Sequence, residues 1–189
     1  MKKIATANNT SEGLVFVIQK HATVRQHYDF RPQIGDTMPS WAIPKGPTLD
    51  PTVKRLAMET TDHDMEYRHF EGVIPEGEYG AGAVMIWDTG TYIPEIEIAK
   101  GVREQVKGAE EGQKAMKEGL KKGELKFVLR GSKLCGSFAL VKTYGFGPKN
   151  SWLLIKHKDD FVKTGYDANA YDSSAITKRT MAEIAAQEA

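Results

Sequence analysis

Short apolar runs alternate with glycine- and proline-rich turns along this chain, and this pattern limits the fold more than any other feature. Runs of about four to eight residues bounded by turn residues are typical of β-strands, and many at close spacing favour a barrel or sandwich. The expected strands are residues 14–19, 28–33, 40–43, 55–59, 83–88, 90–93, 124–130, 136–142 and 152–157. The intervening turns include residues 44–47, 75–80, 88–90 and 145–148. We therefore expect a mainly β protein, a single small β-barrel with flanking helices.

One stretch departs from the strand pattern. Its apolar residues recur at helical spacing, at Val102, Val106, Ala109, Met116 and Leu120. This spacing predicts a solvated helix over about 102–120 on the flank of the barrel. A final helix is expected over residues 180–187. We divide the chain into a flexible N-terminal segment, residues 1–13, and one barrel domain, residues 14–189.

Length, charge and cysteine content exclude several classes of protein. A chain of 189 residues suits one domain with a sizeable core. The net charge of +1 argues against a uniformly basic nucleic-acid binder but allows a local basic groove. The single cysteine, Cys135, rules out an intrachain disulfide, and no apolar run approaches the length of a membrane span. We expect a soluble, cytoplasmic monomer that does not associate with membranes.

The segment from His27 to Arg31 carries the clearest chemical signal. Side chains alternate along a strand, so His27, Asp29 and Arg31 share one face while two aromatic residues face the other way. His21 lies just upstream and can fold back as a third ligand. Two imidazoles and a carboxylate suit a divalent transition ion, and a neighbouring arginine suits a phosphate or carboxylate. The alternative is a solvent-facing polar strand, but the aromatic opposite face favours a cleft and a metal-dependent enzyme acting on an anion.

A second polar cluster spans residues 62–69. His63 and Tyr67 are four residues apart, which on a helical turn places both on one face, where they can donate to phosphate oxygens or a departing alkoxide. The alternative is structural, with Tyr67 covering the core. Lys45 and Arg55 are further cationic candidates for the same anion, although such residues are usually simply exposed on the surface.

The succession of motifs resembles the 3′-phosphoesterase module of bacterial DNA ligase D, which also occurs as a stand-alone protein. The matching stretches are residues 16–21, 27–31, 40–47, 54–57, 62–63 with Tyr67, 70–82, 87–90, 131–136, 152–156 and 179–184. The resemblance thus runs from residue 14 or so to the C-terminus. The ordered set is more specific than any one motif.

The resemblance implies a small β-barrel whose crescent groove holds one divalent metal, typically Mn²⁺. It also implies a hydrolase of DNA break repair by non-homologous end joining. Such enzymes remove a 3′-phosphate and a 3′-terminal ribonucleoside from DNA 3′ ends. The 3′-hydroxyl that they leave serves a polymerase and a ligase, which are the implied partners.

The resemblance also implies roles for individual residues. The metal ligands would be His21, His27 and Asp29, and the contacts to the scissile phosphate would be Arg31, His63 and Tyr67, with Arg55 and Lys45 in support. Ligase-attached members carry an N-terminal extension with an Arg-Asp pair and a glutamate used to trim ribonucleotides. Here only residues 10–13 resemble its end, and Thr61 stands where an acidic residue often precedes the Asp-His pair. We therefore expect strong 3′-phosphatase activity and weaker removal of ribonucleosides.

Two other functions fit parts of the sequence. The spacing of His27 and Asp29 also matches half of the two-His-one-carboxylate site of iron oxygenases, with His157 as the distal histidine. Such enzymes need an arginine soon after that histidine, but the next one is Arg179, beyond the strands. A non-catalytic module that binds DNA ends would use the same cations beside a vestigial metal site, and the intact triad argues against it.

Overall fold

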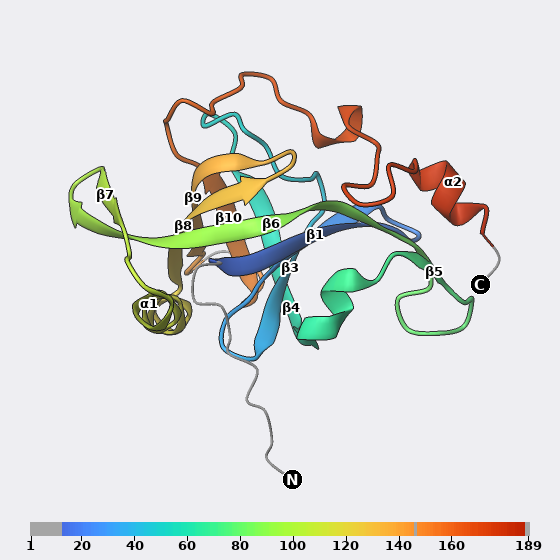
Figure 1. Cartoon of the computed structure of the whole chain (residues 1–189), viewed down its shortest axis with the longest axis horizontal. Coiled ribbons are helices and arrows are strands. Elements are labelled where there is room, and N and C mark those ends of the chain that lie inside the picture. Colours follow the sequence, from blue (N-terminus) through green and yellow to red (C-terminus); the bar gives the residue numbers. More distant parts are fainter. Residues whose placement is uncertain (1–12, 146, 188–189) are drawn as a thin grey trace, which may run out of the picture.

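Eight antiparallel strands close into a barrel in the computed structural model, which describes residues 13–145 and 147–187 (Figure 1). The order around the barrel is β1-β2-β3-β4-β10-β9-β8-β6, and β6 pairs with β1 to close it. The bounds of these strands are β1 Leu14–Ala22, β2 His27–Pro32, β3 Thr37–Ile43, β4 Arg55–Asp64, β6 Gly82–Ala99, β8 Glu124–Gly131, β9 Cys135–Lys142 and β10 Ser151–Lys156. The prediction of a mainly β, single-barrel fold is confirmed.

The longest strand, β6, crosses the whole molecule (Figure 1). Besides β1 and β8, it pairs with the short strands β5 (Gly72–Ile74) and β7 (Val102–Gln105) near its two ends. The predicted turn at residues 88–90 is wrong, because this stretch lies inside β6. A Cβ atom on Gly90 would lie 2.1 Å from the carbonyl oxygen of Arg130. This glycine therefore permits a close approach of β6 and β8 and does not mark a turn.

The helices lie outside the barrel (Figure 1). They are the 3₁₀ turns η1 (Met65–His69) and η2 (Ala168–Ala170) and the α-helices α1 (Ala109–Lys122) and α2 (Met181–Ala185). The predicted helix over residues 102–120 is wrong in its first part, because residues 102–105 form β7 and the helix begins only after Gly108. The predicted final helix is confirmed over a shorter range, with a capping box between Thr180 and Glu183.

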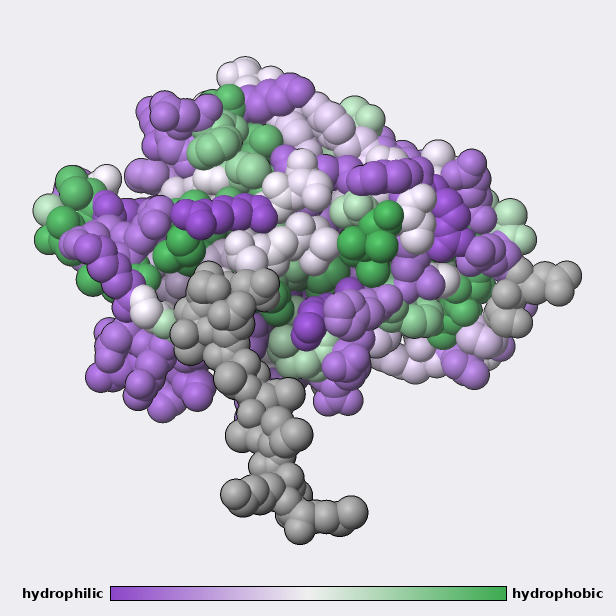
Figure 2. Space-filling view, viewed as in Figure 1, coloured by the Kyte–Doolittle hydropathy of each residue, from purple (hydrophilic) through white to green (hydrophobic). Residues whose placement is uncertain are grey.

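Alternation along the strands separates an apolar interior from a mixed exterior. Tyr28, Phe30, Trp41 and Phe127 are buried inside the barrel and belong to its aromatic core. On the exterior, the hairpin of β6 and β7 projects from the barrel and carries exposed apolar side chains at its tip (Figure 2). The polar face of α1 lies below it (Figure 2).

The predicted N-terminal segment lies almost entirely outside the described residues, since only Gly13 of it is described, as an exposed position before β1. In the part of the chain that the structure describes, none of the helices is long and apolar enough to cross a membrane.

Candidate metal centre and anion pocket

Antiparallel pairing of β1 and β2 brings the three predicted metal ligands together. His21 is paired with His27, and Gln19 with Asp29, so these side chains share the outer face of the barrel wall. One ligand atom from each of His21, His27 and Asp29 lies within 4.8 Å of the others. His21 and Asp29 are buried, and His27 is half-buried.

Each histidine is held by a backbone carbonyl on the side away from Asp29. His21 Nε2 lies 2.7 Å from the carbonyl oxygen of Gly80, and His27 Nδ1 lies 3.0 Å from that of Arg25. If these nitrogens carry the N–H and donate, as metal-bound histidines usually do, His21 Nδ1 and His27 Nε2 are left as lone-pair ligands. The two atoms lie 3.8 Å and 3.3 Å from Asp29 Oδ2.

This donor set fits a divalent transition ion. Ligand atoms that share one such ion at bonds of about 2.1 Å lie roughly 3.0–3.6 Å apart. The distances from Asp29 Oδ2 to the nitrogens of His27 and His21, 3.3 Å and 3.8 Å, lie within this range and just above it. Burial lowers the pKa of His21, which favours the neutral imidazole. The Asp29 carboxylate raises the pKa of His27. Burial by itself raises the pKa of Asp29, but contact with His27 and the charge of Arg31 outweigh it and hold that pKa below its ordinary value.

Arg31 links the cluster to the rest of the pocket. Its Nε donates to Oε1 of Gln19 at 2.7 Å, and its Nη2 donates to Oδ2 of Asp29 at 3.1 Å. The guanidinium lies 5.3 Å from the centre of the Tyr67 ring, a cation–π contact. Arg31 is buried, so these contacts fix its planar group in one orientation.

Gln19 is a site residue that the sequence reasoning missed. It is fully buried, and its Nε2 donates to the carbonyl oxygens of Tyr67 (2.9 Å) and Phe70 (3.1 Å). One amide thus ties η1 and the residue after it to the barrel wall while its oxygen orients Arg31. The only available signal was a polar residue in an apolar strand, two positions before His21 and therefore on the same face.

His63 and Tyr67 meet beside Arg31, although not on a helical turn as predicted. His63 lies near the end of β4 and Tyr67 in η1, and their ring centres are 4.8 Å apart. Nδ1 of His63 is 2.9 Å from the carbonyl oxygen of Thr61 and 3.2 Å from Arg31 Nη1, so it donates to the first or accepts from the second according to its tautomer. Burial and then the charge of Arg31 lower the pKa of His63, which favours its neutral form.

These side chains line one pocket of about 370 Å³ on the outside of the barrel. It includes His21, His27, Asp29, Arg31, His63 and Tyr67, together with Thr60 and Tyr79. The structure does not bring Lys45 and Arg55 to it. Lys45 is exposed in the turn after β3. Arg55 begins β4, at the end of the strand away from His63, and is not among the residues that line the pocket.

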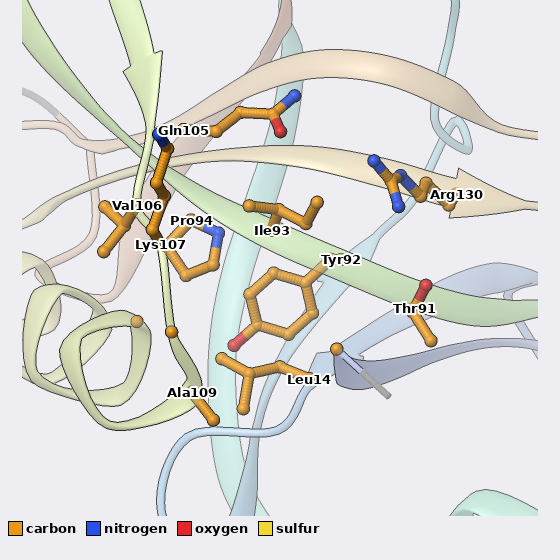
Figure 3. A pocket seen from close by; sticks show the side chains of 13 residues that line it. Leu14, Thr91, Tyr92, Ile93, Pro94, Gln105, Val106, Lys107, Ala109 and Arg130 are labelled. Carbon is orange, nitrogen blue, oxygen red and sulfur yellow. The ribbon is translucent and has the colours of Figure 1, made fainter. Parts of the chain in front are cut away.

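A different pocket, between β6, the segment after β7 and α1, lacks the chemistry of a metal site (Figure 3). It measures about 390 Å³, and the side chains of Leu14, Tyr92 and Pro94 form much of its wall. Its described lining holds two cations, Lys107 and Arg130, but neither histidine nor carboxylate.

The residues that the oxygenase interpretation requires lie elsewhere. His157 does not belong to the cluster of metal-ligand atoms found among the described residues. Arg179 pairs with Glu71 at 3.0 Å, which fixes the C-terminal segment to the barrel.

Comparisons with known proteins identify the family of this chain. Residues 19–142 match the model of the DNA Ligase D 3′-phosphoesterase domain. The multifunctional non-homologous end joining protein LigD of Pseudomonas aeruginosa is 44% identical over 150 residues, which are 79% of this chain and 16% of that protein. The LigD of Mycobacterium tuberculosis, a multifunctional non-homologous end joining DNA repair protein, is 34% identical over 95% of this chain and 21% of its own length.

The chain belongs to the DNA ligase D 3′-phosphoesterase domain family. The LigD proteins are much longer, and this chain spans about a fifth of their length or less. All the pocket residues described above, from Gln19 to Gly80, fall inside the part that matches the DNA ligase D phosphoesterase model. The resemblance found in the sequence is therefore confirmed at the level of the family.

Proposed function

We propose that this domain is a metal-dependent hydrolase that processes DNA 3′ ends in break repair by non-homologous end joining. It removes a 3′-phosphate, and a 3′-terminal ribonucleoside, to leave a 3′-hydroxyl for a ligase and a polymerase. One observation carries the proposal: a cluster of three possible metal ligands lies in the same pocket as Arg31, His63 and Tyr67. Family membership and the names of the LigD relatives supply the substrate.

His21, His27 and Asp29 would hold the ion, and the family expectation is Mn²⁺. A divalent ion at such a site polarises a phosphoryl oxygen and lowers the pKa of a bound water. Arg31 uses three of its five N–H groups on Gln19, Asp29 and the His63 contact, which leaves two for phosphate oxygens. Its fork geometry suits that task.

His63 and Tyr67 would complete the anion pocket. Nε2 of His63 and the hydroxyl of Tyr67 have no hydrogen-bond partner among the described residues, so both can donate to a substrate. Protonation of the departing oxygen would require His63 to be the imidazolium, with Nδ1 donating to the carbonyl oxygen of Thr61. In the neutral tautomer that carries its proton on Nε2, His63 would instead stabilise the charge of that oxygen by donating a hydrogen bond. In that tautomer Nδ1 accepts from Arg31, which holds the ring in place.

The test is release of phosphate from an oligonucleotide that ends in a 3′-phosphate, with and without added Mn²⁺. A matched oligonucleotide with a 5′-phosphate is the control, and a primer-template ending in one ribonucleotide measures the diesterase reaction. We expect release that depends on the metal and on the 3′ position. Tight binding of the 3′-phosphorylated end without any release would instead identify a DNA-end-binding module.

A further inference from the structure

Tyr79 is both fully exposed and part of the wall of the metal pocket. A second fully exposed apolar side chain, Val24, lies in the turn between β1 and β2, next to another lining residue, Thr23. The pocket therefore has an aromatic ring in its wall that the fold itself does not cover.

The backbone beside Tyr79 is fixed to the metal site. The carbonyl oxygen of the next residue, Gly80, lies 2.7 Å from Nε2 of His21. At the end of the same loop, a Cβ atom on Gly82 would lie 2.2 Å from the carbonyl oxygen of Ala22, so the loop packs directly on the end of β1. The backbone next to Tyr79 is thus held at a set position relative to a predicted metal ligand.

The charges around Tyr79 indicate what can cover it. Glu76 and Glu78 are exposed on the same loop, and carboxylates repel a phosphate backbone. An uncharged flat group is not repelled, and an aromatic ring attracts such a group by stacking. In an oligonucleotide whose terminal phosphate lies beside Arg31, the flat group attached to the same nucleotide is its base.

We propose that Tyr79 is a stacking platform for the terminal nucleobase of the strand whose 3′ end enters the pocket. This inference rests on the proposed function and adds a positioning residue to it. Tyr79 contributes to binding of the DNA end and takes no part in the chemical step. Stacking does not depend on hydrogen-bond readout, so the platform accepts any of the four bases.

The experiment removes each partner of the stack in turn. Steady-state kinetics compare wild type with Tyr79→Ala on a 3′-phosphorylated oligonucleotide and on the same oligonucleotide with an abasic terminal nucleotide. We expect Tyr79→Ala to raise KM about tenfold on the normal substrate with kcat nearly unchanged. On the abasic substrate the two proteins should have the same KM, because the wild type has lost the same contact.

Three further measurements separate stacking from other roles. Tyr79→Phe, which keeps the ring and loses the hydroxyl, should behave as wild type. Phe161→Ala removes another exposed aromatic, from the segment after β10, and should change neither constant. A terminal 2-aminopurine should lose fluorescence on binding to wild type and not on binding to Tyr79→Ala.

The possible failures are distinguishable. If Tyr79→Ala leaves KM unchanged, or raises it equally on normal and abasic substrates, the stacking proposal is wrong although the hydrolase remains. If the wild type releases no phosphate, the proposed function is wrong, and the 2-aminopurine titration alone decides whether a base stacks on Tyr79.

Discussion

Nη2 of Arg31 donates to Oδ2 of Asp29 at 3.1 Å, and this oxygen is also the carboxylate atom nearest to the ligand nitrogens of His21 and His27. The proposed metal site and the proposed phosphate site thus share one carboxylate oxygen. An anion bound by the free N–H groups of Arg31 would lie next to the ion. Through this shared atom, one short strand would serve both proposed sites.

Removal of a predicted ligand should abolish metal binding without unfolding the barrel. His27→Ala deletes a half-buried side chain on the outer wall, so we expect loss of Mn²⁺ binding and of metal-dependent activity with a nearly unchanged melting temperature. Isothermal titration measures the binding of Mn²⁺, and differential scanning calorimetry measures the melting temperature. His157→Ala is the matched control and should bind the ion normally, whereas the oxygenase interpretation requires the opposite.

Arg31→Lys should impair catalysis although it keeps the positive charge. A lysine cannot donate at once to Gln19, to Asp29 and to a phosphate in fork geometry. We expect kcat/KM on a 3′-phosphorylated oligonucleotide to fall about 10–100-fold. Lys45→Ala, an exposed cation that does not line the pocket, should stay within about twofold of wild type. Equal losses in the two variants would contradict the role given to Arg31.

Metal affinity should weaken as the pH falls. Asp29 raises the pKa of His27 above its ordinary value of 6.5, so His27 gains a proton first as the solution is acidified from pH 8. The lowered pKa of His21 delays its protonation. Because the ion binds only the neutral imidazole, affinity should be constant well above the pKa of His27 and fall about tenfold per pH unit below it. Mn²⁺ titrations between about pH 8 and 5 test this, and a flat profile would exclude His27 as a ligand.

Gln19→Leu should destabilise the protein and disturb the pocket together. The change leaves the carbonyl oxygens of Tyr67 and Phe70 without their donor and Nε of Arg31 without its acceptor. We expect the free energy of unfolding, measured in urea, to fall by about 2–4 kcal/mol. Gln105→Leu, at an exposed position of β7, should change it by less than about 0.5 kcal/mol.

The strands could be predicted because alternation and turn residues are local signals. The wrong predictions, the turn at residues 88–90 and the helix over residues 102–105, have their cause in contacts between distant segments. Asp88 resembles a turn residue, but its carboxylate accepts the backbone N–H groups of Ser132, Lys133 and Leu134 from the β8–β9 turn. Val102 falls at a helical spacing from the apolar residues of α1, but it lies in a strand because it pairs with β6.

The candidate site shows the same division between local and distant information. His27, Asp29 and Arg31 could be placed on one face because a strand alternates. The structural role of Gln19 could not be predicted. The carbonyl groups to which it donates belong to η1 and the residue after it, about 50 residues away along the chain. The same holds for Gly80, whose contribution is a backbone oxygen that no side-chain pattern reveals.

Both strands that carry the three predicted ligands are flanked on each side, β1 by β2 and β6, and β2 by β1 and β3. The backbone positions of the three residues cannot move apart unless ladder hydrogen bonds of the closed wall break. We therefore expect the barrel to be fully folded before it binds an ion. Binding should produce a small heat-capacity change and leave the amide-exchange protection of β1 and β2 unaltered. In this respect the domain would contrast with zinc fingers, which fold only around their metal.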